Sequence, residues 1–510
     1  MPRWWSIITD GTTVAAGGRD TSLHRANRTL AGILLLALAL RVAVAFIPAI
    51  AHPDELWQYL EPAHYLTNGT WVRAWEYRAG IRSWLIPLVV AGPMGIGHFI
   101  APGTMLPVLL PRFLCALGSL TLVWTCYRFG ALAGRRQALI AGIVAAVWSE
   151  LLFYGPRTLS EPISLSLFLP AAWLLIGKGA DVSRRQLALA GLLLGLAVCA
   201  RLQMAPIVGA LAIIGGGRDI RRWTAMMMGG IVALAISAGV DVIAGDVPFR
   251  WMIENFRINL IEHKSASFGV EPWYWYLTQT VRNWSIATLF IVPLALVGAR
   301  RHPALLILAL VHLAAHSVIP HKEMRFILPT LALFVLLASL GSGDLLARVT
   351  RTASRRTATW AAIGTIAAWT ILSGIAAVSG SSQKLWQSHR TILLAIRAAG
   401  VDPAACGLAF FSPKPPAPAN YSFYDRETPI YNFYGPDAAK VAAPWRGAFN
   451  VAIAPLAAGA GLGPAYRATY CAPGRKGAPQ EFCVFRRPGA CPIAGPKHYE
   501  IEAVMRRWGH

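Results

Sequence analysis

Charged side chains are scarce in this sequence: only 14% of its 510 residues are Asp, Glu, Lys or Arg. Soluble proteins carry about 25% charged residues, so the roughly three or four soluble domains that this length would otherwise suggest are excluded. Hydrophobic residues make up 55% of the chain, and its mean hydropathy is +0.48. The composition therefore predicts an all-α polytopic membrane protein.

Acidic residues are also few, with 24 Asp and Glu against 47 Lys and Arg and a net charge of +23. In a soluble protein this imbalance would indicate a nucleic-acid partner. Here the arginines form short clusters between apolar runs, a pattern typical of membrane-topology signals. No nucleic-acid partner is expected. The 39 Arg against 8 Lys and the Ala-rich runs favour a GC-rich bacterial genome.

The chain is predicted to begin with a polar and basic cytoplasmic tail, residues 1–29, without a cleavable signal peptide. About 20 apolar residues cross a hydrocarbon core. The stretch 84–100 is interrupted by Pro87, Pro93 and glycines, so we expect it to lie on the outer side without crossing. About eleven transmembrane helices are then predicted, near residues 30–50, 104–128, 137–154, 162–178, 186–200, 204–216, 223–244, 284–299, 303–319, 326–346 and 358–380.

The arginine clusters then all fall on the cytoplasmic side, as the positive-inside rule requires. The transmembrane domain is predicted at residues 30–380, and its first outer loop at 51–103. Residues 381–510 lack helical periodicity and predict a small α/β domain on the outer face. We therefore expect a multi-pass protein of a bacterial inner membrane with a periplasmic C-terminal domain. The alternative is the endoplasmic reticulum membrane.

Four of the seven cysteines, Cys406, Cys471, Cys483 and Cys491, lie in the predicted outer domain. An even number on one side predicts two disulfides in an oxidising compartment. Three pairings are possible, and the sequence does not choose between them. The alternative is four free thiols in the cytoplasm.

The first outer loop opens with His52-Pro53-Asp54-Glu55. His52 can cap a helix that has Pro53 in its first turn. In a regular helix, Asp54, Gln58, Glu61 and Tyr65 would then share one face. Acidic residues at a membrane boundary are costly unless they face a polar cavity. The simpler alternative is that Asp54 and Glu55 stabilise the positive end of the helix.

A second polar group follows the ninth predicted span, where His321, Lys322 and Arg325 are suited to bind a phosphate group. The alternative is contact with lipid headgroups by snorkelling side chains. The aromatic run Trp273–Tyr276 predicts a sugar or lipid contact, or an ordinary interfacial belt. Arg82 and Arg157 are expected on the same side and are added to the phosphate-binding set.

Four motifs follow one another along the chain. They are His52-Pro53-Asp54-Glu55, Trp75-Glu76-Tyr77 followed by Ile81-Arg82-Ser83, Gly269-x-x-Pro272-Trp273-x-Trp275-Tyr276, and His321-Lys322-Glu323-x-Arg325-Phe326-Ile327-Leu328-Pro329. Together they resemble the motifs of the Alg9-like (family 22) mannosyltransferases, over roughly residues 30–345. Met324 departs from the commonest eukaryotic form at a variable position. The C-terminal part shows no such resemblance.

The resemblance implies a GT-C fold and an inverting transfer of mannose from a polyprenyl-phosphate donor to a glycan or glycolipid acceptor at the outer face. It implies Asp54 as the base, with Glu55 beside it, and places His321, Lys322, Glu323 and Arg325 near the donor phosphate. Inverting transfer needs a carboxylate base and positive charge on the leaving phosphate. Because the sequence has no Asp-x-Asp metal motif, the cations are expected to supply that charge, with no metal or other cofactor.

The predicted substrate-binding residues are His52, Gln58, Glu323, Trp273 and Trp275. Two alternatives remain at this point. The same fold is compatible with another lipid-linked sugar or acceptor. A lipid flippase or transporter would show mid-span charges and paired halves, but most ionisable residues cluster at one face and no internal repeat is seen.

Overall fold

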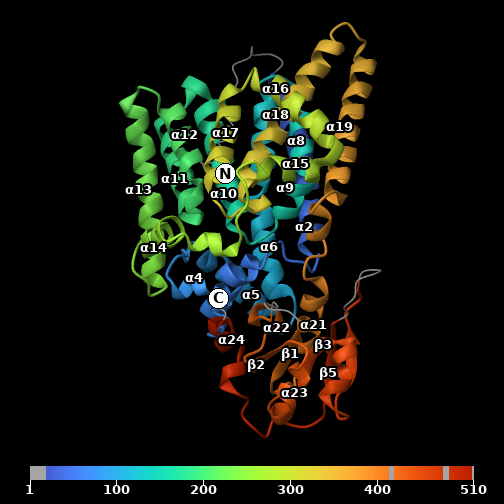
Figure 1. The fold of residues 1–510 in the computed structure, drawn as a ribbon. Coiled ribbons are helices and arrows are strands. Elements are labelled where there is room, and N and C mark those ends of the chain that lie inside the picture. Colours follow the sequence, from blue (N-terminus) through green and yellow to red (C-terminus); the bar gives the residue numbers. More distant parts are fainter. Residues whose placement is uncertain (1–18, 413–418, 475–481, 508–510) are drawn as a thin grey trace. The chain divides into compact units, whose positions relative to one another are not determined.

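The computed structural model describes residues 19–412, 419–474 and 482–507. The first 18 residues of the predicted cytoplasmic tail lie outside this part. The described chain divides into two compact units (Figure 1). Unit 1 contains the residues up to Val44 and Cys115–Gln383, and unit 2 contains Ala45–Leu114 and Lys384 onwards. The first outer loop therefore belongs to the same unit as the C-terminal part of the chain.

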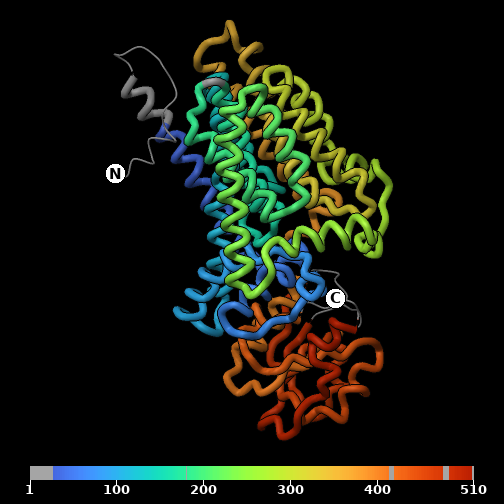
Figure 2. Tube along the Cα trace, turned by 90° about the vertical axis from the view of Figure 1, so that its left-hand side faces the viewer, coloured from blue at the N-terminus to red at the C-terminus, as the bar shows by residue number. Residues whose placement is uncertain are grey.

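Unit 1 is a bundle of helices that run roughly side by side (Figures 1 and 2). Its helices are α2 (Arg19–Ala45), α7 (Leu120–Ala131), α8 (Arg135–Val147), α9 (Ser149–Tyr154), α10 (Ser160–Ala172), α11 (Arg184–Ala200), α12 (Ala205–Gly216), α13 (Ile220–Ile243), α14 (Arg250–Phe256), α15 (Trp275–Trp284), α16 (Thr288–Ala299), α17 (Pro303–Val318), α18 (Leu328–Val349), α19 (Arg355–Val378) and part of α6 (Leu106–Gly118). Short π or 3₁₀ turns adjoin several of them, among them η2 (Trp173–Gly177), η4 (Leu202–Met204) and η8 (Met324–Ile327).

Each of the eleven predicted apolar runs contains a helix. Among the described residues, seven helices are long and apolar enough to cross a membrane, so the chain is a multi-pass membrane protein. The remaining four predicted spans are shorter or interrupted; for example, the run 137–154 is divided between α8 and α9 by Trp148, whose ψ is 123°. The seven are Asn27–Ala45, Leu106–Ala131, Ser160–Gly177, Ile220–Ile243, Trp275–Ala299, Met324–Val349 and Arg355–Val378.

Glycines allow neighbouring helices of unit 1 to approach closely. A Cβ atom added to Gly191 of α11 would lie 1.9 Å from the carbonyl oxygen of Met226 in α13. One added to Gly229 of α13 would lie 1.8 Å from the carbonyl oxygen of Ala188. Only glycine fits at such separations, and small residues of this kind let helix backbones pack in a membrane, where hydrophobic collapse contributes little.

The first outer loop in unit 2 contains η1 (Glu55–Leu60), α3 (Glu61–Asn68), α4 (Trp75–Arg78) and α5 (Leu85–Ile100). The expected shared face of Asp54, Gln58, Glu61 and Tyr65 is wrong. Because η1 is a π-helical turn, it changes the residue spacing. Gln58 and Glu61 are buried, whereas Tyr65 is 42% exposed. The expectation that α5, which has 16 residues, does not cross the membrane stays a prediction.

The C-terminal part of unit 2 contains a five-stranded sheet among its described residues, in the order β2-β1-β3-β5-β4. The pairs β1–β2 and β1–β3 are parallel, whereas β3–β5 and β4–β5 are antiparallel. This confirms a small α/β region. Its elements are α20 (Ser382–Leu385), α21 (Arg390–Gly400), β1 (Leu408–Ser412), α22 (Tyr421–Tyr424), β2 (Ile430–Tyr434), α23 (Ala438–Ala442), β3 (Val451–Pro455), β4 (Arg467–Cys471), β5 (Phe482–Arg486) and α24 (Ile501–Arg507).

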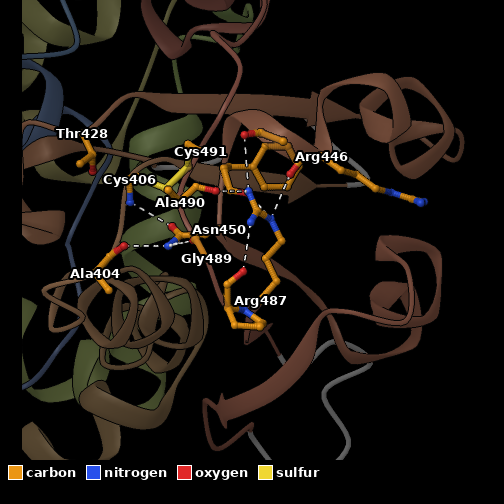
Figure 3. The surroundings of a disulfide bond; sticks show 12 residues. Ala404, Cys406, Thr428, Arg446, Asn450, Arg487, Gly489, Ala490 and Cys491 are labelled. Atoms are coloured by element: carbon orange, nitrogen blue, oxygen red, sulfur yellow. Dashed lines mark hydrogen bonds between the residues drawn. A yellow bond between two sulfur atoms is a disulfide. The ribbon is translucent and has the colours of Figure 1, made fainter.

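Two disulfides form among the four cysteines of this region, as predicted. Cys471 and Cys483 join the paired strands β4 and β5, whereas Cys406 before β1 joins Cys491 after β5. Asn450 accepts a hydrogen bond from the backbone N–H of Cys406 at 2.9 Å and donates one to the carbonyl of Ala404 at 2.7 Å (Figure 3). The structure thus selects one of the three possible pairings.

Candidate active site

The acidic motif of the first outer loop begins with a close pair, His52 and Asp54. His52 Nδ1 lies 3.2 Å from the backbone nitrogen of Asp54, whose N–H donates to it, and 3.2 Å from Asp54 Oδ1. His52 thus accepts a backbone N–H just before η1 (Glu55–Leu60), but the N-cap position itself is occupied by Asp54. The Asp54 side chain is 18% exposed and that of His52 is 33% exposed, so a solvent-borne ligand can reach both.

Glu55, the next residue, is fully enclosed. Its Oε1 lies 3.1 Å from Nη2 of Arg112, its Oε2 accepts from the backbone N–H of Ala51 at 3.0 Å, and neither charged side chain is exposed. Arg112 also donates to three backbone carbonyls that precede the motif, those of Ala45, Ile47 and Ala49. The buried ion pair thus fixes the segment that leads into Asp54. Glu55 is adjacent to Asp54 in the sequence, but its environment is that of a structural group.

A second acid, Glu76, lies beside two predicted site residues. Gln58 donates an amide hydrogen to Glu76 Oε1 at 2.7 Å, and Nη2 of Arg82 is 3.8 Å from the same oxygen. Burial raises the pKa of Glu76, whereas the positive charge of Arg82 opposes that shift and the charge of Asp54 adds to it. Gln58 and Arg82 are therefore brought together through Glu76.

In unit 1, the cationic motif forms an ion-pair network rather than a set of free cations. Arg325 Nη1 lies 2.8 Å from Glu161 Oε1, and Arg325 Nε lies 2.6 Å from Glu323 Oε2. The other oxygen of Glu323 is 3.0 Å from Nε2 of His321. Arg325 is 5% exposed and the His321 side chain is 21% exposed, so the histidine is the accessible end of this chain of contacts.

Arg201 completes the network and was not singled out from the sequence. Its Nη1 lies 3.1 Å from Glu161 Oε1 and 3.2 Å from the hydroxyl of Ser160. Glu161 therefore lies between two arginines, and it has no exposed surface. The predicted phosphate ligand Arg157 is fully buried, with its guanidinium 4.6 Å from the centre of the Phe153 ring.

Lys322 and the two tryptophans of the aromatic run differ from one another in their contacts and exposure. The ammonium group of Lys322 donates to the carbonyl of Glu271 at 3.1 Å and to the carbonyl of Ile319. Trp273 is 68% exposed, whereas Trp275 begins α15 and is half-buried. The two tryptophans are therefore exposed to different degrees.

The predicted residues thus fall into two groups, one in each unit. Four further members had been given no role from the sequence. Of these, Arg112 and Arg201 carried a usable signal, because each is a single arginine inside or directly after an apolar run, where charge is costly. The four are Glu76, Glu161, Arg112 and Arg201. Unit 2 holds His52, Asp54, Glu55, Gln58 and Arg82, and unit 1 holds Arg157, Trp273, Trp275, His321, Lys322, Glu323 and Arg325.

Known proteins resemble more than half of this chain. "GPI mannosyltransferase 3" of Drosophila melanogaster is 29% identical over 319 residues, which cover 59% of this chain and 54% of that protein. "Alpha-1,2-mannosyltransferase ALG9" of Mus musculus is 26% identical over 378 residues, covering 66% and 59%. The chain therefore spans just over half the length of these curated relatives.

A solved structure shows the fold. The crystal structure of ArnT from Cupriavidus metallidurans, bound to undecaprenyl phosphate, covers 91% of this chain and 98% of its own, with a TM-score of 0.56 and 13% identity. The fold is GT-C, as predicted. The family model of the Alg9-like mannosyltransferases matches residues 32–388, well over half of the sequence. The chain belongs to the Alg9-like mannosyltransferase family.

Proposed function

We propose that this protein is an inverting glycosyltransferase that transfers mannose from a polyprenyl-phosphate donor to a lipid-linked glycan or glycolipid. The relatives are named as mannosyltransferases, which supports the sugar and the reaction class. The ArnT structure contains a polyprenyl phosphate, which supports a lipid-phosphate donor on this fold. A bilayer and an acceptor glycan are then the partners that the protein needs.

The contrast between Asp54 and Glu55 carries this proposal. A base must reach the acceptor hydroxyl and accept its proton as that oxygen attacks. Glu55 has no exposed surface and its charge is paired with Arg112. Asp54 keeps 18% of its side chain exposed, beside His52. Asp54 is therefore the base of the proposed reaction, and Glu55 holds the backbone that presents it.

The proposed step is a single displacement. The acceptor oxygen bonds to the anomeric carbon while its proton moves to the Asp54 carboxylate. The bond between that carbon and the phosphate oxygen breaks, and the polyprenyl phosphate leaves with the electron pair. Cations that stabilise this developing charge lower the barrier, and His321, Lys322 and Arg325 are assigned that role. Glu161 and Glu323 hold Arg325 in a fixed orientation, so little reorganisation is needed.

The remaining predicted residues receive supporting roles. Arg82 and Arg157 extend the positive field for the donor phosphate. His52, Gln58 and Glu323 are assigned to sugar or acceptor hydroxyl groups, because each carries hydrogen-bonding atoms next to the proposed base or cations. Trp273, which is largely exposed, and Trp275 are assigned to a sugar ring or a lipid chain.

The donor assignment predicts that purified protein uses polyprenyl-phosphate mannose and not GDP-mannose. Arg325→Ala should raise the KM for the donor about tenfold or more and change the acceptor KM less, because a hydrogen bond to a charged group contributes about 1.5–3 kcal/mol. His321→Asn, at the more exposed end of the network, should act in the same direction. Initial rates at varied donor and acceptor concentrations measure both constants.

Arg356→Ala, at the exposed start of α19 in unit 1, is the matched control and should leave both constants unchanged. Transfer from GDP-mannose alone would overturn the donor assignment. Equal increases in the donor and acceptor constants for both motif variants would contradict phosphate binding by this cluster.

We further propose that the protein lies in a bacterial inner membrane with residues 1–29 in the cytoplasm and residues 381–510 in the periplasm. Because residues from Lys384 onwards form one unit with Ala45–Leu114, the first outer loop would lie on the same side. The arginine clusters between the spans support this orientation. The two disulfides of the C-terminal region support an oxidising compartment for that region.

Single cysteines test the orientation after Cys115, Cys126 and Cys199, the free cysteines, are replaced by alanine. A membrane-impermeant maleimide added to intact spheroplasts should label Lys440→Cys, whose native side chain is 86% exposed. It should not label Arg355→Cys until the membrane is permeabilised. Labelling of Arg355→Cys in intact spheroplasts would reverse the proposed topology.

A further inference from the structure

Unit 2 contains a compact group of metal-ligand residues that the proposed reaction does not use. His64 lies in α3, His98 lies in α5, and Asp425 follows α22. Each of the three can offer a ligand atom within 4.8 Å of those of the other two. The two imidazole rings meet edge to face, with centroids 5.4 Å apart. Residues far apart in the sequence therefore converge on one point within the unit.

Hydrogen bonds fix the tautomer of His64. Its Nδ1 lies 2.8 Å from the carbonyl oxygen of Thr70. Because a carbonyl only accepts, Nδ1 must carry the hydrogen, and in the neutral ring the lone pair then resides on Nε2. Metal-binding histidines characteristically donate their second ring nitrogen in this way to a carbonyl or carboxylate.

His98 is arranged in the same manner. Its Nδ1 lies 2.8 Å from Asp425 Oδ1, and an ionised carboxylate likewise only accepts. The second oxygen of Asp425 accepts from the backbone N–H of Gly103 at 2.6 Å. The carboxylate is therefore held on both sides, and Asp425 keeps a left-handed backbone conformation, with φ of 56°, that Asp and Asn tolerate better than most residues.

Both remaining ring nitrogens are buried acceptors without a hydrogen-bond partner among the described residues. The two atoms are Nε2 of His64 and Nε2 of His98. His64 as a whole is 1% exposed. A buried polar atom without a partner is destabilising and uncommon in native proteins. A single case would be compatible with an ordinary core histidine. Two such nitrogens on neighbouring rings, in a group whose ligand atoms gather within 4.8 Å of one another, are better explained by a cation that the group binds.

We propose that His64, His98 and Asp425 bind a divalent first-row transition-metal ion, with His64 ligating through Nε2. Two imidazole nitrogens and one carboxylate oxygen form a ligand set that suits zinc. The ion would link α3 and α5 of the first outer loop to the turn after α22. Its role would be structural, because none of the three residues belongs to the proposed acid–base or phosphate-binding groups. The site is therefore independent of the proposed transferase reaction.

Metal analysis of the full-length protein tests this site. The protein is purified without a polyhistidine tag, treated with chelator, equilibrated with micromolar ZnCl₂ and passed through a desalting column. Elemental analysis should give about one zinc per chain for the wild type, as expected for a single site of three protein ligands with water in the fourth position, and should show loss of that zinc in the His64→Ala/His98→Ala double variant. Asp425→Asn retains the backbone preference and should weaken zinc affinity at least ~10-fold.

His498→Ala is the matched control, since His498 is an exposed histidine of the same unit, and it should bind zinc as the wild type does. Zinc should also raise the melting temperature of the chelator-treated wild type but not that of the double variant. Cobalt in place of zinc should give visible ligand-field bands in the wild type alone. A wild-type protein that binds no zinc, or a folded double variant that binds as much as the wild type, would overturn the proposal, and the wild-type result holds even if the double variant fails to fold.

Discussion

Asp54→Asn is expected to lower turnover by ~10²–10⁴-fold, the usual contribution of a positioned general base, while the melting temperature stays close to that of the wild type. Asparagine has nearly the same shape as aspartate but cannot accept the acceptor proton. The native side chain is partly exposed, whereas that of Glu55 is fully enclosed beside Arg112, so the loss of the Asp54 charge should affect folding less than the loss of the Glu55 charge. Single-turnover kinetics with the lipid-linked donor, together with thermal unfolding, measure the two quantities.

Glu55→Gln provides the contrasting control. It leaves Arg112 with a buried charge and a neutral partner, so it should lower the melting temperature more than Asp54→Asn does. The remaining folded enzyme should retain much more activity than Asp54→Asn. Near-normal turnover in Asp54→Asn, combined with an inactive but stably folded Glu55→Gln, would move the base to Glu55 and refute the assignment made from exposure.

The helices could be predicted from the sequence because they follow from local patterns, whereas the roles of the candidate site residues stay predictions. Apolar runs of about 20 residues indicate spans directly, and all eleven runs contain helices. The disulfide count also followed from the position of four cysteines. The breaks within shorter spans were less predictable, since a turn such as that at Trp148 depends on one backbone torsion.

The partners of the site residues could not be predicted, because they depend on contacts between distant parts of the chain. Arg112 is 57 residues from Glu55, and Glu61 binds the backbone N–H of Ser422, 361 residues away, at 2.7 Å. The π-helical turn η1 similarly moved Gln58 and Glu61 away from the regular helical spacing on which the shared-face prediction relied. A motif therefore predicted that Arg325 and Asp54 matter, but not that Arg325 would lie between two carboxylates.

Arg112→Met is expected to be the most destabilising substitution considered for unit 2, at roughly 3–5 kcal/mol, the range for removing one partner of a buried ion pair. The variant would leave the Glu55 carboxylate buried without its guanidinium partner, although the carboxylate would still accept from the Ala51 N–H. It would also remove the guanidinium donor from the carbonyls of Ala45 and Ala49. Unpaired buried acceptors add their own desolvation cost. The melting temperature and the yield of monodisperse protein in detergent should both fall.

The double variant Arg112→Met/Glu55→Gln separates the charge effect from the loss of packing. Neutralising the carboxylate that has lost its guanidinium partner should recover part of the stability lost in Arg112→Met, so the two changes should be strongly non-additive. Arg73→Met, at an exposed arginine of the same loop, should change stability by less than about 0.5 kcal/mol. If Arg112→Met unfolds at the wild-type temperature, or if the double variant shows simple additivity, the Glu55–Arg112 pair does not hold the segment that presents Asp54, and the structural reason for assigning the base to Asp54 rather than Glu55 is lost.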